Sequence, residues 1–277
     1  MSIDAAALET GAFIDAGGYR THYHEAGSGE PLLFIHGSGP GVTAWANWRF
    51  ALGAFADRFH VLAPDVLGFG YSDRPDGIAY GKDVWVDHMI AFLDAKHITR
   101  AHIVGNSMGG AVAIALAAKR PDLVDRLVLM GSCGIAFPIT PGLDAVWGYE
   151  PSRERMRALI ADYFAYDGAI VTDALVDMRY AASIQPGFQE SYGRMFPAPR
   201  QAGVDGLATP VEQIKAITAQ TLLIHGREDK VIPLSVSYEL FELIPNAELH
   251  VFGNCGHWTQ IERKDPFNTI VSAFLTR

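Results

Sequence analysis

Short apolar runs alternate along this chain with longer amphipathic or small-residue stretches, and this alternation constrains the fold more than any other feature. Runs of strand length lie at residues 20–24, 32–35, 61–63, 101–104, 126–130, 221–224 and 248–252. Stretches that fit helices lie at residues 44–54, 82–95, 108–119, 235–243 and 266–275. Such a series is typical of a mostly parallel sheet flanked by crossover helices. The sequence therefore predicts an α/β fold.

The pattern is interrupted once, between about residues 134 and 210. Strand-like runs disappear there, prolines cluster and aromatic residues become frequent, and the βα series then resumes. We therefore expect residues 134–210 to form an inserted helical cap, and residues 1–133 and 211–277 to form the core. One domain with one insertion also suits a chain of 277 residues.

Charge and apolar content exclude several classes of protein. The formal net charge is -9, the pI is about 5.5 and no dense Lys/Arg run occurs, so nucleic acid is not an expected partner. The longest fully apolar run, residues 111–118, is far shorter than the roughly 20 residues of a membrane helix. Residues 1–18 lack the apolar core of a signal peptide. Because Cys133 and Cys255 have no metal-finger spacing, we expect reduced thiols in a soluble, cytoplasmic protein.

The sequence GNSMGG at residues 105–110 lies between an apolar strand and a helix rich in small residues. A tight strand-to-helix turn of this kind leaves a Ser hydroxyl exposed, and its glycines allow the close packing that the turn needs. Ser107 is therefore the candidate nucleophile. The alternative is that Ser107 only caps the helix.

A Ser nucleophile needs a base, and the base needs an orienting carboxylate. Asp229 follows one late strand and His257 follows the next, so the chain order Ser, Asp, His is that of α/β-hydrolases. Glu228 is the rival acid, and a solvated turn is the alternative role for Asp229. No metal is predicted, because His22 and His24, which alternate on a strand, have no third ligand nearby in sequence.

The strand at residues 32–35 ends in a glycine-rich loop, HGSGPG. A phosphate-binding loop of the Walker type would continue with Lys and then Ser or Thr, whereas Gly41 is followed by VTAWANW. A loop after an early strand is also where α/β-hydrolases keep half of their oxyanion hole. The other half is the N–H of the residue after the nucleophile, here Met108.

Motifs spread over nearly the whole chain carry a more specific resemblance. They are HGSGPGVTAWANWR, APDVLGFGYSDRP, DVWVDH, GNSMGG, GLDAVWGYEPS, FPAPRQ, HGREDKVIP and CGHWTQIE. Together they resemble the meta-cleavage product hydrolases, α/β-hydrolases with a helical cap that act in the degradation of aromatic compounds. The resemblance implies hydrolysis of a carbon–carbon bond in a 2-hydroxy-6-oxo-dienoate, giving 2-hydroxypenta-2,4-dienoate and a short carboxylic acid. It also implies that no cofactor is needed and that the chain forms a homodimer or larger oligomer.

The same resemblance assigns roles to individual residues. Ser107 becomes the nucleophile, His257 the acid/base and Asp229 its orienting acid, while the backbone N–H of Ser38 joins that of Met108 in the oxyanion hole. The residues that match the polar subsite for the dienoate end are Asn47, Asn106, Arg179 and Trp258. The residues that match the walls around the leaving acyl group are Leu143, Trp147, Val231 and Ile232. The large Trp147 favours a formyl or methyl group over a phenyl group.

Two other functions share parts of this pattern. A Ser carboxylesterase on the same fold would use the same triad and oxyanion loop, but a substrate without a carboxylate would not need Arg179 and Trp258. A non-catalytic ligand-binding homologue would keep the fold without turnover. A carboxylate on the substrate is thus the feature that distinguishes a dienoate hydrolase from an ordinary esterase.

Overall fold

The computed structural model describes residues 5–277 and contains one sheet of eight strands, in the order β1-β2-β4-β3-β5-β6-β7-β8. The first pairings, β1 with β2 and β2 with β4, are antiparallel, and the others are parallel. The strands are β1 (Ala12–Ala16), β2 (Tyr19–Ala26), β3 (Glu30–Ile35), β4 (Phe59–Pro64), β5 (Ala101–Asn106), β6 (Val124–Met130), β7 (Gln220–Gly226) and β8 (Ala247–Phe252). The α/β prediction is confirmed. The sequence missed only β1, because this short edge strand is mostly exposed and has no apolar run.

Helices cover both faces of the sheet, and the strand sequences explain why. Leu33 and Ile35 of β3 pack in the cluster that contains α3 (Lys82–Ala95) and α4 (Met108–Lys119), whereas Leu32 and Phe34 pack toward α2 (Ala44–Phe55) and α13 (Lys264–Leu275). Successive side chains of a strand point to opposite faces, so a strand covered on both sides reads as a continuous apolar run. The remaining helices of the core are α1 (Ala5–Thr10), α10 (Val211–Lys215), α11 (Leu234–Leu243) and α12 (Thr259–Glu262).

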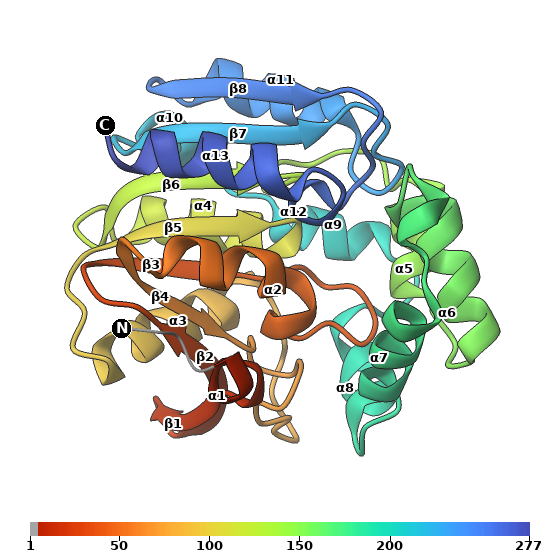
Figure 1. Cartoon of the computed structure of the whole chain (residues 1–277). Coiled ribbons are helices and arrows are strands. Elements are labelled where there is room, and N and C mark those ends of the chain that lie inside the picture. The colour runs from red at the N-terminus through yellow and green to blue at the C-terminus, as the bar shows by residue number, and fades with distance from the viewer. Residues whose placement is uncertain (1–4) are drawn as a thin grey trace.

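The chain between β6 and β7 contains helices and no strand. Before α10, its elements are α5 (Pro141–Trp147), α6 (Arg153–Leu159), the π-helix η1 (Ile160–Phe164), the short 3-10 helix η2 (Gly168–Ile170), α7 (Asp173–Ser183), α8 (Phe188–Met195) and α9 (Gln201–Leu207). Threonine and serine side chains cap three of these helices, as at Thr140 and Ser152. Helices α5 to α8 stand beyond the carboxyl ends of the parallel strands (Figure 1). Ligands bind at this edge in open α/β sheets.

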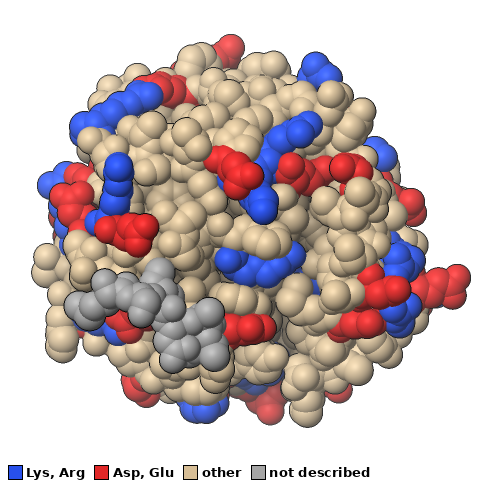
Figure 2. Space-filling model, in the orientation of Figure 1, with Lys and Arg blue, Asp and Glu red and all other residues tan. Residues whose placement is uncertain are grey.

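The surface carries no dominant charge on the face shown in Figure 2, where acidic and basic side chains are interspersed. Within residues 5–277, no helix is long and apolar enough to cross a membrane.

Gly109 lies at a closely packed position and Gly53 at an open one, so alanine substitutions at the two positions test the packing. A Cβ on Gly109 would lie 2.3 Å from the carbonyl oxygen of Ile35, whereas one on Gly53, in the last turn of α2, would meet nothing within 4 Å. We expect Gly109→Ala to lower the free energy of unfolding by more than about 2 kcal/mol. Gly53→Ala should raise it by about 1 kcal/mol, because alanine favours the helix. Urea unfolding checks both, and a stable Gly109→Ala variant would contradict the packing.

His88 makes the stability depend on pH. Its Nδ1 accepts from the N–H of Leu67 (3.2 Å) and its Nε2 donates to Thr21 Oγ1 (2.8 Å), whose hydroxyl donates to the carbonyl of Tyr19. Burial lowers the pKa of His88 to about 4 from 6.5. The unfolded chain therefore takes up this proton first as the pH falls, and stability is lost between about pH 6.5 and 4.

We expect His88→Gln to remove part of this loss. As the pH is lowered through that window, the unfolding free energy of the parent should fall by up to about 3 kcal/mol more than that of the variant. Urea unfolding at a series of pH values measures it. Parallel curves for the two proteins would show that His88 does not contribute.

Candidate active site

Ser107 occupies a strained turn between β5 and α4. Its backbone has φ 56° and ψ -118°, a conformation that non-glycine residues rarely adopt. Hydrogen bonds hold the turn: the N–H of Ser107 donates to Met130 (3.0 Å), and its carbonyl accepts from Cys133 (3.1 Å). Surrounding structure that fixes an unfavourable backbone is a common feature of functional sites. The turn is the geometry that the GNSMGG motif predicts.

The N-terminus of α4 faces the same region. Met108 is the first residue of α4, so its N–H has no carbonyl one turn earlier in the helix to bind. The helix dipole adds positive potential there, which favours a developing negative charge. Cys133 lies close by, but burial raises the pKa of its thiol to about 12, so it is a neutral group and not a rival nucleophile.

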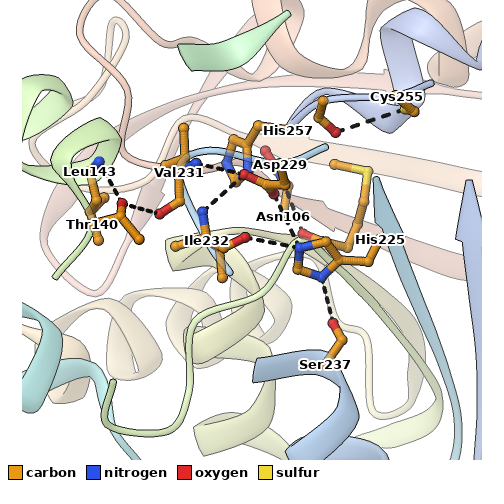
Figure 3. Close-up of polar contacts among 12 residues, drawn as sticks. Asn106, Thr140, Leu143, His225, Asp229, Val231, Ile232, Ser237, Cys255 and His257 are labelled. Atoms are coloured by element: carbon orange, nitrogen blue, oxygen red, sulfur yellow. Dashed lines mark hydrogen bonds and ion pairs between the residues drawn. The ribbon is translucent and has the colours of Figure 1, made fainter. Parts of the chain in front are cut away.

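Asp229, in the loop after β7, is a buried carboxylate held by several donors (Figure 3). Its Oδ1 accepts from the N–H groups of Val231 (2.8 Å) and Ile232 (2.9 Å), and its Oδ2 lies 2.6 Å from His257 Nδ1. Burial alone would raise the pKa of Asp229, but the charge and hydrogen bonds of His257 and His225 outweigh it and lower this pKa well below its usual range. Asp229 therefore stays ionised.

His257, in the loop after β8, is buried and is also held by the cap. Its N–H donates to the carbonyl of Phe164 in η1 (2.8 Å), and the rings of the two residues lie 5.7 Å apart. The approach to its imidazole is tight, because a Cβ on Gly131 would lie 3.2 Å from Nδ1. Ser107 and His257 line one cavity.

The rival acid points elsewhere. One carboxylate oxygen of Glu228 accepts from Arg227 and the other from the N–H of Cys255 (3.0 Å). Asp229, and not Glu228, is thus the acid that contacts the imidazole.

The glycine-rich loop after β3 lies against Ser107. A Cβ on Gly37 would be 3.1 Å from the Cβ of Ser107, and Ser38 lines the same cavity. The cap fixes Ser38 at two atoms: Trp147 Nε1 donates to its Oγ (2.9 Å) and the Tyr192 hydroxyl donates to its carbonyl (2.9 Å). Neither contact uses the Ser38 N–H, which is the predicted oxyanion donor.

Arg179, from α7, is a buried cation. Its side chain lies over the Trp258 ring at 5.2 Å, and its Nε has no hydrogen-bond partner. No carboxylate of residues 5–277 forms an ion pair with it. Burial lowers its pKa to about 10, which leaves it charged at neutral pH.

The two asparagines of the predicted polar subsite differ. Asn47 is buried, lines the Ser107 cavity and has an Nδ2 without a partner. Asn106 also lines the cavity, but its Nδ2 donates to the carbonyl of Met130 (3.1 Å). A buried amide nitrogen without a partner is costly, and a polar ligand in the cavity would relieve this cost.

Only two of the four residues that the sequence assigned to the apolar walls of the pocket line the cavity. Leu143 and Val231 line the cavity, as do Val146 and Phe164, which the sequence did not single out. Trp147 instead lies behind Ser38, stacked on Phe196 at 4.4 Å, and Ile232 contributes its N–H to Asp229. The free volume of the cavity is about 10 Å³, room for about one water molecule. Side chains or cap helices must therefore move to admit a substrate.

A larger cavity of about 390 Å³ lies apart from this chemistry. It is lined by residues of the N-terminal strands, the start of α2 and α7, including His22, His24 and Trp45. His22 is engaged by Asp65 at 2.8 Å. No group of three His, Cys, Asp or Glu side chains in the described part of the chain could hold a metal ion.

Comparison with known proteins gives a consistent result. The sequence model of the α/β hydrolase fold matches residues 30–264. The chain is 57% identical over 267 residues to 2-hydroxymuconate semialdehyde hydrolase of Pseudomonas sp. strain CF600, covering 96% of this chain and 94% of that protein. It is 52% identical to 2-hydroxy-6-oxo-2,4-heptadienoate hydrolase of Pseudomonas putida, covering 96% of each.

Solved structures agree. A meta-cleavage product hydrolase from Pseudomonas fluorescens IP01, crystallised with acetates, superposes with a TM-score of 0.95 at 56% identity, covering 98% of this chain and 99% of that chain. The fold, the strained serine and the buried acid–imidazole pair define a hydrolase of the α/β-hydrolase fold family. Within that family, the chain belongs to the meta-cleavage product hydrolases.

Substitutions of Asp229 and of Glu228 test which of the two acids orients the His257 imidazole. Asp229→Asn should lower kcat for a dienoate or an activated aryl ester by on the order of 10³-fold, because the amide no longer fixes the tautomer and charge of His257. Glu228→Gln should change kcat by less than about threefold. Steady-state kinetics on both variants decides which acid is used, and similar losses would contradict the assignment.

Proposed function

We propose that this enzyme hydrolyses the C5–C6 bond of 2-hydroxy-6-oxo-dienoates, namely 2-hydroxymuconate semialdehyde or its 6-alkyl analogues. The products are 2-hydroxypenta-2,4-dienoate and a short carboxylic acid. The observation that carries this proposal is the buried guanidinium of Arg179, which has no ion-pair partner among residues 5–277, because it suits a substrate with a carboxylate and has no use in hydrolysis of a neutral ester. The substrates named for the relatives support it.

The polar end of the substrate would bind between Arg179, Asn47 and the face of Trp258. Arg179 pairs with the carboxylate, and the free Nδ2 of Asn47 donates to a substrate oxygen. We assign Asn106 to the same subsite, at its border with Ser107. Loss of water from this site strengthens each of these contacts.

Cleavage needs an electron sink, which the substrate provides once it is a ketone. A proton moves from the 2-hydroxyl to C5, assisted by His257 and Ser107, and gives the 2-oxo tautomer. Addition of an oxygen nucleophile to C6 then forms an oxyanion, which the N–H groups of Ser38 and Met108 stabilise. Either Ser107 attacks or it activates the attacking water.

Collapse of this intermediate breaks the C5–C6 bond. The bonding electrons pass into the conjugated 2-oxo system, and protonation of the resulting enolate gives 2-hydroxypenta-2,4-dienoate. The C6 carbonyl carbon leaves as the carboxylic acid, with the oxygen of water added. Asp229 stabilises the imidazolium of His257 during both proton transfers.

The acyl side of the pocket would favour a small 6-substituent. Leu143 and Val231 border the cavity, Trp147 is fixed on Ser38, and the closed cavity leaves little room. A formyl or methyl group therefore fits better than a phenyl group.

We also propose that residues 134–210 act as a cap that opens to admit the substrate, on the core formed by residues 1–133 and 211–277. The contacts of Phe164 with His257 and of Trp147 with Ser38 support this role. A cytoplasmic location, expected from the two unpaired cysteines, and a homodimer or larger oligomer, implied by the family resemblance, complete the proposal.

Absorbance measurements test the reaction. The purified protein should remove the yellow colour of the ring-fission products of catechol and 3-methylcatechol, and Ser107→Ala should slow this by orders of magnitude. Persistent colour with both compounds, together with rapid hydrolysis of a simple aryl ester, would replace the proposal with a serine esterase.

A further inference from the structure

Asp229 contacts a second histidine. His225, the penultimate residue of β7, has no exposed surface, and its Nε2 lies 3.3 Å from Asp229 Oδ2. The same Nε2 lies 3.0 Å from the carbonyl oxygen of Ile232, and Nδ1 lies 2.7 Å from the hydroxyl oxygen of Ser237 on α11. Figure 3 shows this ring on the side of Asp229 away from His257. The mechanism above does not use it.

The contacts fix which nitrogen carries the proton. A carbonyl oxygen can only accept a hydrogen bond, so His225 Nε2 must be the donor to Ile232. Its hydrogen is then shared with Asp229 Oδ2, an ionised acceptor. In the neutral ring Nδ1 has a lone pair, which accepts from the hydroxyl of Ser237. Ser237 therefore stabilises the tautomer that faces Asp229.

The carboxylate is thereby fixed at both oxygens. Oδ1 is held by the N–H groups of Val231 and Ile232, whereas the two imidazoles are the only groups of the described residues that hold Oδ2. Without the second imidazole, the carboxylate could rotate about the Oδ1 contacts. Two thiols of the described residues, those of Cys133 and Cys255, also lie within electrostatic range of Asp229. Burial raises the pKa of each to about 12, so both thiols are neutral at neutral pH and add no charge near Asp229.

We propose that His225 is a positioning residue that holds Oδ2 of Asp229 against His257 through its Nε2–H, with its tautomer set by Ser237. This role rests on the proposed use of Asp229 and His257 as the acid and base of the reaction. His225 does not touch the substrate. It acts on the reaction only through the orientation and basicity of Asp229.

A pair of conservative variants separates positioning from packing. Glutamine can place an amide N–H where Nε2 lies, whereas asparagine reaches only the position of Nδ1. We expect His225→Asn to lower kcat about tenfold with KM within about twofold, since small misplacements of catalytic groups are costly. His225→Gln should retain most of the parent's kcat. Equal effects of Asn and Gln would overturn the proposal.

The pH profile gives a readout that packing would not move. When Oδ2 is no longer held against His257, Asp229 accepts less strongly from the Nδ1–H of His257, and the charged form of His257 is less favoured. The acid limb of kcat/KM should therefore move to lower pH in His225→Asn and stay in place in His225→Gln. In an Asp229→Asn background, His225→Asn should have no further effect on kcat, and a full additional loss would overturn the proposal.

A third measurement needs no substrate. The Nδ1 proton of His257, followed by proton NMR, should shift in His225→Asn and keep the parent's position in His225→Gln. This result is independent of the identity of the substrate, so it distinguishes failure of the positioning role from failure of the proposed function. If His225→Asn does not fold, Ser237→Ala, which leaves the ring in place, should produce a smaller shift in the same direction. An unchanged resonance in the folded variant would refute the role.

Discussion

The buried cation of Arg179 is the constraint on which much of this structure depends. Removing a guanidinium from water without a partner is costly, and burial lowers its pKa to about 10. The loop after β3 is shaped around it: a Cβ on Gly39 would lie 2.7 Å from its Nη2, and one on Gly41 would lie 1.9 Å from its carbonyl oxygen. The same loop presents Gly37 to Ser107. The glycines of this loop thus allow close approach to both Arg179 and Ser107.

Residues 134–210 form separate hydrogen bonds to three segments that carry proposed site residues. Phe164 accepts from His257, Trp147 donates to Ser38, and Thr140 donates to the carbonyl of Val231 (2.7 Å), whose N–H holds Asp229. The Thr140 hydroxyl also caps α5 by accepting from the N–H of Leu143 (Figure 3). Because the cavity is nearly closed, movement of the cap on substrate binding would reach all three groups. The proposed opening of the cap would therefore also change the geometry of the proposed catalytic residues.

The sequence predicts the parts of the fold that depend on local patterns. Doubly covered strands such as β3 produce apolar runs, and the turn at Ser107 needs its glycines, so both are visible in the sequence. The position of Trp147 behind Ser38 is not visible in the sequence, because a hydrogen bond between residues 109 positions apart leaves no local signal. For the same reason nothing in the sequence links His225 to Asp229 other than a spacing of four residues. The roles of the site residues stay predictions until they are tested.

The central claim is that Arg179 recognises the substrate carboxylate, and a comparison of two substrates tests it most directly. Steady-state kcat/KM would be measured for the dienoate and for its C1 methyl ester, with the parent and with Arg179→Gln. The account predicts that the variant loses about 10²-fold for the carboxylate and little for the ester, because only the carboxylate loses a charged partner. Equal losses for both substrates, or none for either, would contradict it.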